Sequence, residues 1–194
     1  MTIQHAILGL LSWRPFSGYD LKKAFAESTV FYWSGNSNQI YKALVQLHQD
    51  GLVTQEIQHQ ESLPTKKIYT ITEAGRAALE QWVLAAPELP EFRSTFLVQL
   101  AWADTLDAGS LDALLGTYEE EVRVQILMQQ EKARRPAAAP ARTPREAYLW
   151  TMITQNVISA YENELRWVRD VRAGVGALTT GPSVSGAPDE GGAG

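Results

Sequence analysis

Polar side chains that could recognise a partner by hydrogen bonding are concentrated in residues 36–42. Amide and hydroxyl groups on the exposed face of a helix are the groups that bind base edges in the major groove of DNA. A basic pair, Lys66 and Lys67, follows further along the chain, and lysine ammonium groups bind phosphates without reading sequence. Each of these residues also has an ordinary structural use, as a helix cap, a turn residue or a guard of a strand edge. The elements around them therefore have to decide between the two interpretations.

Groups for catalysis or metal binding are not clustered in this sequence. It contains no cysteine, and its three histidines, His5, His48 and His59, fall in separate segments without the spacing of metal ligands. A glycine-rich phosphate loop and a nucleophile elbow are both missing. The acidic run at residues 119–121 would point in three directions around a helix, which indicates a solvated face. We therefore expect no enzyme activity, no metal site and no cofactor.

The composition is typical of a soluble globular protein, with 45% hydrophobic and 20% charged residues in a chain of 194. No apolar stretch reaches the roughly 18 residues of a membrane span, and the first residues lack the basic segment of a signal peptide. We therefore expect a cytoplasmic protein without a membrane partner. The net charge of −5 arises beyond residue 86, because basic and acidic residues are equal in number over residues 1–86. A neutral domain offers only local basic patches, which weighs against strong non-specific binding to DNA.

Residues 1–86 have the pattern of three helices, a β-hairpin and a fourth helix. Apolar spacing and turn residues place these elements at residues 3–12, 17–27, 36–51, 52–58, 66–71 and 73–86. Ser17 opens a capping box, Asn36 or Ser37 caps the third helix, Gly51 ends it, and Thr72 caps the fourth. This order predicts a winged helix-turn-helix, in which the third helix enters the DNA groove and the hairpin forms the wing.

The rest of the chain has helical periodicity. Helices are predicted over residues 92–104, 107–135 and 143–172, with a Pro/Ala linker at 136–142 that could act as a hinge. The chain after residue 173 is rich in Gly, Ser, Pro and Ala, which is typical of disorder. The expected fold is mostly α-helical with a small β-hairpin. It comprises a winged helix-turn-helix domain (1–86), a helical dimerisation and effector domain (87–173) and a disordered tail (174–194).

The last predicted helix carries two apolar faces, which indicates packing both on its own domain and on something else. We assign dimerisation to the first face, formed by Trp150, Val157, Tyr161, Leu165 and Val168. The second face contains Leu149, Met152, Ile153 and Ile158. Large aromatic residues also line apolar ligand sites, so Trp102 and Trp150 are candidates for an effector site, although such residues more often belong to a core or a dimer contact.

Three segments in residues 3–84 resemble the PadR-type regulators: SGYDLKKAF, NQIYKALVQLHQDGLV and LPTKKIYTITEAGRAAL. The helical remainder resembles the longer subgroup of that family. The resemblance implies a dimer built by the C-terminal helices, repression of nearby genes, and release from DNA by a small molecule or another signal. It also implies that Tyr19 and Tyr41 lie near the DNA. Lys42 stands where proline is common in the family, which adds a cation to the proposed DNA face and leaves the sequence preference open.

We therefore predict a transcription repressor that binds an inverted-repeat operator in double-stranded DNA as a homodimer. The predicted DNA-binding residues are Ser17, Tyr19, Lys22, Asn36, Ser37, Asn38, Gln39, Tyr41, Lys42, Lys66 and Lys67. An activator would dock in the same way, and the operator sequence and the effector cannot be read from these side chains. The alternative is a protein-interaction or ligand-sensing module that kept the fold without tight DNA binding. The neutral charge balance of residues 1–86 favours that alternative.

Overall fold

The computed structural model describes residues 3–28, 37–60, 63–89, 94–135 and 140–180. The chain forms two compact units. The N-terminal unit comprises residues 1–92 with 127–159, and the helical unit comprises residues 93–126 with 160–194.

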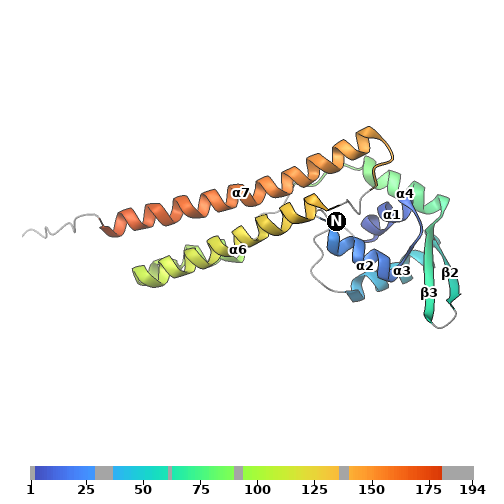
Figure 1. The fold of residues 1–194 in the computed structure, drawn as a ribbon, viewed down its shortest axis with the longest axis horizontal. Helices are drawn as coiled ribbons and strands as arrows, with labels where there is room; N and C mark the ends of the chain where they lie inside the picture. Colours follow the sequence, from blue (N-terminus) through green and yellow to red (C-terminus); the bar gives the residue numbers. More distant parts are fainter. Residues whose placement is uncertain (1–2, 29–36, 61–62, 90–93, 136–139, 181–194) are drawn as a thin grey trace, which may run out of the picture. The chain divides into compact units, whose positions relative to one another are not determined.

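The N-terminal unit contains four helices and a small antiparallel sheet (Figure 1). The helices are α1 (Ile3–Trp13), α2 (Gly18–Glu27), α3 (Ser37–Gln49) and α4 (Glu73–Leu84). The strands are β1 (Phe16–Ser17), β2 (Val53–Gln60) and β3 (Leu63–Ile71), in the order β1-β3-β2. The predicted winged helix-turn-helix fold is thereby confirmed. Strand β1 was not predicted, because two residues are too few to show an alternating pattern.

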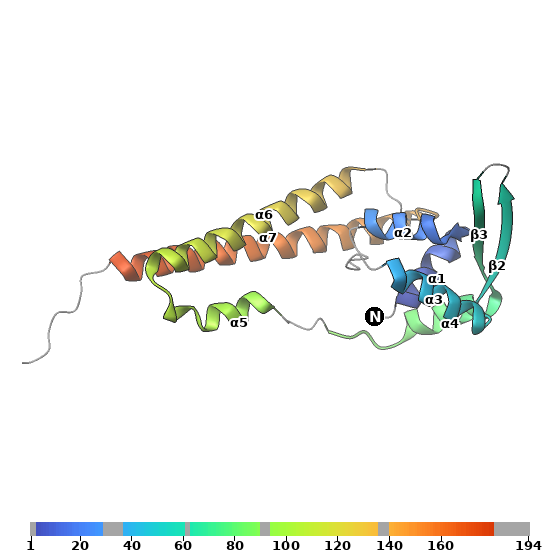
Figure 2. The same cartoon turned by 90° about the horizontal axis from the view of Figure 1, so that it is seen from below.

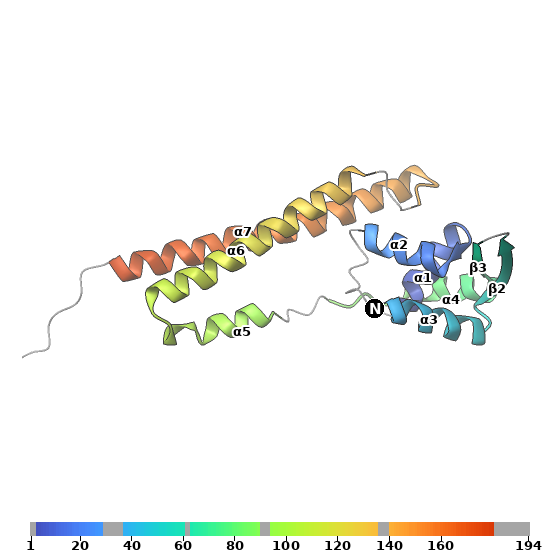
Figure 3. The same cartoon turned by 60° about the horizontal axis from the view of Figure 1, so that its bottom comes forward.

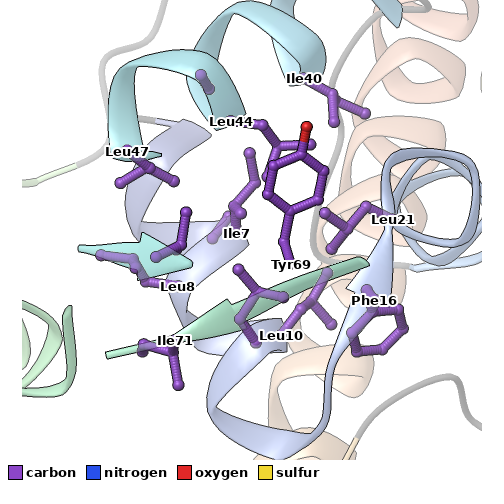
Figure 4. Close-up of a cluster of buried hydrophobic side chains, with 14 of the residues drawn as sticks. Ile7, Leu8, Leu10, Phe16, Leu21, Ile40, Leu44, Leu47, Tyr69 and Ile71 are labelled. Atoms are coloured by element: carbon purple, nitrogen blue, oxygen red, sulfur yellow. The ribbon is translucent and has the colours of Figure 1, made fainter. Parts of the chain in front are cut away.

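One hydrophobic core holds these elements together (Figure 4). Leu44 and Leu47 of α3 are at most 1% exposed, and they pack in one cluster with Ile7 of α1 and Leu21 of α2. Tyr69 of β3 is buried in the same cluster. Burying one side chain of this size contributes about 1.5–3 kcal/mol. The inward face of α3 is thereby fixed, and its polar face is left at the surface.

Side-chain caps define where the helices of this unit begin and end. The Ser17 hydroxyl accepts a hydrogen bond from the Asp20 backbone N–H at 3.1 Å, and the Thr72 hydroxyl accepts one from the Gly75 N–H at 3.1 Å. Gly51, with a φ of 70°, follows α3 in the left-handed conformation that favours glycine. The predicted caps at Ser17 and Thr72 and the terminating glycine are confirmed, whereas Asn36 and the side chain of Ser37, the predicted caps of α3, lie outside the described residues.

The helical unit contains α5 (Thr95–Ala101), a short 3₁₀ turn (Ala103–Thr105), the first part of α6 (Ala108–Arg134) and the last part of α7 (Pro144–Thr180). Helix α5 lies beside the first part of α6 (Figures 2 and 3). The ring of Phe96 stacks on Tyr118 with centroids 3.5 Å apart, and Trp167 meets Phe96 edge-on. Tyr118 donates a 2.7 Å hydrogen bond to Glu164, and burial together with this carboxylate raises the pKa of Tyr118 to about 12.

Arginines of α7 fix its position along α6 within the helical unit. Arg172 donates to both carboxylate oxygens of Asp112, at 2.6 and 2.8 Å. Arg169 donates to Glu119 at 2.7 Å, and Arg172 also reaches Glu119. Exposed ion pairs of this kind contribute at most about 1 kcal/mol each, so their main effect is to set the register of the two helices.

Two predicted helix boundaries in this region are wrong. Helix α7 continues to Thr180, so residues 174–180 are helical although their composition predicted disorder. Adding residues to an existing helix costs far less than starting one, which offsets the low helix propensity of Gly174 and Gly176. Residues 181–194 lie outside the described residues. The helix predicted over residues 92–104 is shorter, because Trp102 leaves the helical conformation.

The remaining parts of α6 and α7 belong to the N-terminal unit, and its helix ends are contacted by α6 and by the segment that precedes α7. The Arg142 guanidinium donates to the carbonyl of Ser12 in the last turn of α1 at 3.1 Å. The Lys132 ammonium donates to the carbonyl of Ser28, the C-cap of α2, at 3.4 Å. The C-terminal end of a helix carries partial negative charge, so both contacts are electrostatically favourable.

Substitutions at two glycines, Gly75 and Gly9, would show how tightly the N-terminal unit is packed. An added Cβ at Gly75 would collide with the carbonyl oxygen of Leu52, whereas one at Gly9 would meet nothing within 4 Å. We expect Gly75→Ala to lower the free energy of unfolding by about 1–3 kcal/mol through overpacking. Gly9→Ala should raise it by about 0.5–1 kcal/mol, because alanine is the better helix former. Urea unfolding of both variants measures the difference, and equal effects at the two sites would contradict the packing described.

Candidate nucleic-acid interface

Helix α3 separates its apolar and polar side chains onto opposite faces. Ile40, Ala43, Leu44 and Leu47 are buried in the core. Asn38, Gln39, Tyr41 and Lys42 are exposed. Asn36 and the side chain of Ser37 lie outside the described residues. The exposed groups include an amide pair, a phenol and an ammonium, which together can hydrogen-bond to base edges and phosphates.

The first turn of α2 lies directly against this face. An added Cβ at Gly18 would stand 2.5 Å from Cε1 of Tyr41, so the Tyr41 ring packs on the backbone of Gly18. Tyr19, the next residue, is 69% exposed, and Lys22 is also exposed. The packing of Tyr41 on Gly18 therefore joins the start of α2 to the polar face of α3.

Tyr69 is a buried core residue with Tyr41 as an electrostatic neighbour. Tyr69 lies on β3, paired with Phe16 of β1, and only 5% of it is exposed. Burial, together with the neighbouring phenol of Tyr41, raises the pKa of Tyr69. The Tyr69 phenol therefore stays neutral at physiological pH and can donate a hydrogen bond.

The structure does not support the prediction that Ser17 contacts DNA. It is 3% exposed. Its hydroxyl accepts from the Asp20 N–H and donates to Oδ2 of Asp20 at 2.8 Å. The cap that marks the start of α2 takes the hydroxyl's only donor, and burial keeps the Ser17 hydroxyl away from a ligand.

The two lysines of the hairpin are not equivalent. Lys66 lies opposite Gln58 and Lys67 lies opposite Ile57, so successive side chains point to opposite faces of the hairpin. The Lys66 ammonium forms an ion pair with Oδ2 of Asp20 at 3.0 Å. Partial burial favours the neutral acid, but the hydrogen bonds from Lys66 and Ser17 outweigh it and hold the pKa of Asp20 below its usual value. Lys67 is exposed, and none of the ion pairs found among the described residues involves it.

Two charged residues near the wing were missed by the sequence reasoning. Asp20 was interpreted only as part of a capping box, and a partner 46 positions away in the sequence leaves no local signal. Arg14 lies over the rings of Phe16 and Trp13, at 4.4 and 5.0 Å from their centroids. It lines a cavity of about 190 Å³ between α1 and α2 that Asp20, Lys23 and Glu27 also line. The spacing Trp-Arg-Pro-Phe was the available clue, because arginine stacks on aromatic faces.

The two candidate effector tryptophans belong to different units. Trp102, at the end of α5 in the helical unit, is 74% exposed, and Trp150 in the N-terminal unit is half-buried. A hollow of about 560 Å³ in the helical unit is lined instead by Trp167, which was not predicted as a site residue. Its other lining residues are Leu97, Asn163, Glu164, Arg166 and Asp170.

Part of the predicted dimerisation face, around Val168, does not suit contact with a second chain. Val168 has no exposed surface, and it packs with Leu165 in the core of its own helical unit. The Val168 side chain therefore has no exposed surface with which to contact a second chain. Trp150, Val157 and Tyr161 are half-buried. Leu149, Met152 and Ile153 of the second face are exposed, and Tyr148 beside them is exposed as well.

None of the helices in the described ranges is long and apolar enough to cross a membrane. Across the same ranges, no three metal-ligating side chains are grouped.

Two family models match this chain. Residues 7–81 match the transcriptional regulator PadR-like family, and residues 92–175 match the C-terminal domain of virulence activator alpha. Over 89 residues the chain is 36% identical to the negative transcriptional regulator PadR of Bacillus subtilis. That match covers 46% of this chain and 49% of the relative, so it spans about half the length of that protein.

Solved structures of these regulators have the same fold. Bacillus subtilis PadR in complex with operator DNA superposes with a TM-score of 0.76 at 23% identity, covering 89% of this chain and 98% of that one. The same protein in complex with p-coumaric acid gives 0.71 at 22% identity, covering 90% and 95%. The Vibrio cholerae virulence activator AphA gives 0.69 at 27% identity, covering 91% and 99%. The resemblance to PadR-type regulators of the longer subgroup is confirmed.

The contact between Gly18 and Tyr41 can be tested without a ligand. We expect Gly18→Ala to turn the Tyr41 ring away from α2, because the new methyl group would occupy its place. Tyr41 is already 46% exposed, so the ring can move into solvent and the free energy of unfolding should change by less than about 1 kcal/mol. Nuclear Overhauser contacts of the Tyr41 ring report its position. A ring that keeps its contacts in the variant would contradict the close approach.

Proposed function

We propose that this chain, a member of the PadR-like family of transcriptional regulators, represses transcription by binding an inverted-repeat operator as a homodimer. The observation that carries this proposal is the two-faced helix α3. Leu44 and Leu47 fix its rotation in the core, and its exposed face carries hydrogen-bonding side chains beside the start of α2 and the wing. An amphipathic helix of this kind suits insertion into a major groove.

Each exposed group has a proposed role at the DNA. Asn38, Gln39 and Tyr41 read base edges, and Asn36 and Ser37 precede them at the end of α3 that enters the groove. Contacts to phosphates come from Tyr19, Lys22, Lys42 and Lys67. The operator complex of Bacillus subtilis PadR, which shares this fold, supports DNA as the partner.

We place the dimer contact on the second apolar face of α7. Tyr148, Leu149, Met152 and Ile153 are between 40% and 62% exposed and lie on one side of the helix. Exposed apolar side chains that gather in this way mark interaction surfaces. A two-fold dimer would place two copies of α3 in successive major grooves, about 34 Å apart, which calls for an inverted repeat.

We propose that a small molecule releases the repressor. The p-coumaric acid complex of Bacillus subtilis PadR supports a small-molecule effector, and Trp102 or Trp150 remains its proposed contact. A ligand changes DNA affinity only if it binds two conformations unequally. The contacts of Arg142 and Lys132 with the ends of α1 and α2 offer a path by which movement of α6 or α7 would reach the DNA-binding helices.

The DNA-binding role predicts a specific loss in one variant. We expect the double variant Tyr41→Ala, Lys42→Ala to bind DNA from upstream of the protein's own gene at least about tenfold more weakly, because base and phosphate contacts are both removed. Arg76→Ala, which deletes an exposed charge on α4, is the control and should bind normally. Fluorescence anisotropy at several salt concentrations, with random duplex as competitor, measures both. A wild-type chain that binds no duplex at all would favour the interaction-module alternative.

The dimer contact predicts a change of assembly state. We expect Met152→Glu to raise the dimer dissociation constant by about 30-fold or more, because a two-fold contact would bury two unpaired carboxylates. Thr151→Glu adds the same charge on another side of α7 and should leave the dimer intact. Sedimentation velocity of both variants measures the difference. A wild-type chain that is monomeric at micromolar concentration would contradict the dimer proposal.

A further inference from the structure

We propose that Asp20 keeps Lys66 of the wing away from the DNA phosphates and leaves Lys67 as the phosphate-binding lysine of that strand. The proposal rests on the DNA-binding function proposed above. It assigns opposite roles to two adjacent lysines that the sequence alone treated as a pair.

The geometry around Asp20 holds its carboxylate in place. Oδ2 of Asp20 accepts a hydrogen bond from the Ser17 hydroxyl at 2.8 Å and lies 3.0 Å from the Lys66 ammonium. Ser17 is buried, and its backbone pairs with Ile68 in the β1–β3 ladder. Lys66 is two residues from Ile68 on the same strand, so its side chain emerges on the same side. The ion pair is therefore held at both ends by the sheet and the cap of α2.

The charges of this pair cancel, which changes what Lys66 can do at a DNA surface. A lysine binds a phosphate by displacing condensed counterions, and each such contact adds about 0.9 to the salt slope of binding. The ammonium of Lys66 already has an anionic partner, and the Asp20 carboxylate would repel a phosphate that approached it. Lys67 points to the opposite face, and the ion pairs found within the described ranges leave it without an acidic partner.

Removing one cation from the interface lowers the affinity for DNA of any sequence. Phosphate contacts supply nearly all of the affinity for random DNA, whereas base contacts supply discrimination. A carboxylate that cancels one wing lysine therefore lowers non-specific binding and leaves the base-reading face of α3 unchanged. Because the pKa of Asp20 is held below its usual value, the cancellation persists throughout the physiological pH range.

The test is a set of four variants of the full chain, namely Asp20→Asn, Lys66→Gln, Lys67→Gln and the double variant Asp20→Asn, Lys66→Gln. Each is titrated by anisotropy against random duplex at several salt concentrations. We expect Lys67→Gln to reduce the salt slope by about 0.9 per protomer and Lys66→Gln to leave it unchanged. Asp20→Asn should increase the slope by about the same amount and tighten binding to random duplex. The double variant should return to the wild-type slope.

The opposite pattern would overturn the proposal. If Lys66→Gln reduces the slope as much as Lys67→Gln, and Asp20→Asn has no effect, Lys66 contacts phosphates in spite of Asp20. A second measurement needs no DNA, since the carboxyl carbon of Asp20 can be titrated by NMR. We expect its pKa to rise towards the usual value in Lys66→Gln, and an unchanged pKa would overturn the ion pair itself. A wild-type chain that binds no duplex would refute the DNA-binding function as well, while the titration would still report on the pair.

Discussion

The burial of one face of α3 is the constraint on which the N-terminal unit depends. Leu44 and Leu47 pack among side chains of α1, α2 and β3, so the rotation of α3 about its axis is fixed by hydrophobic contacts and not by its polar residues. A helix of 3.6 residues per turn that buries these positions must expose Tyr41 and Lys42. The recognition face is therefore a consequence of the core, and it needs no hydrogen bonds of its own to be oriented.

Most of the N-terminal fold could be predicted because its signals are local. The caps at Ser17 and Thr72, the left-handed Gly51 and the apolar spacing of α3 each involve residues within one or two turns of one another. The interaction of Asp20 with Lys66 joins segments 46 residues apart, and no local pattern encodes it. Ser17 illustrates a different failure. Serine suits both a helix cap and a DNA contact. Only the structure shows that the Ser17 hydroxyl is buried and hydrogen-bonded to Asp20 within the cap of α2.

The helical unit was harder to predict because one helix carries two apolar faces. Spacing identified both faces of α7, but it gave no means of deciding which face the chain itself covers. Val168 and Leu165 pack with Phe96 and Leu115 of the same unit, which leaves the face around Met152 exposed. The end of α7 was misjudged for a related reason. The glycines of residues 174–180 predicted disorder because glycine has a low intrinsic helix propensity. Extending a helix that already exists costs little free energy, so α7 continues through them.

The two compact units do not correspond to two consecutive stretches of sequence. The chain leaves the N-terminal unit after residue 92, re-enters it within α6 and leaves it again within α7, without interrupting either helix. A recombination event that exchanged residues 1–92 alone would separate Ser12 and Ser28 from Arg142 and Lys132. Both contacts are made to backbone carbonyls, so an exchanged segment would have to keep the ends of α1 and α2 in place, whatever residues it carried there.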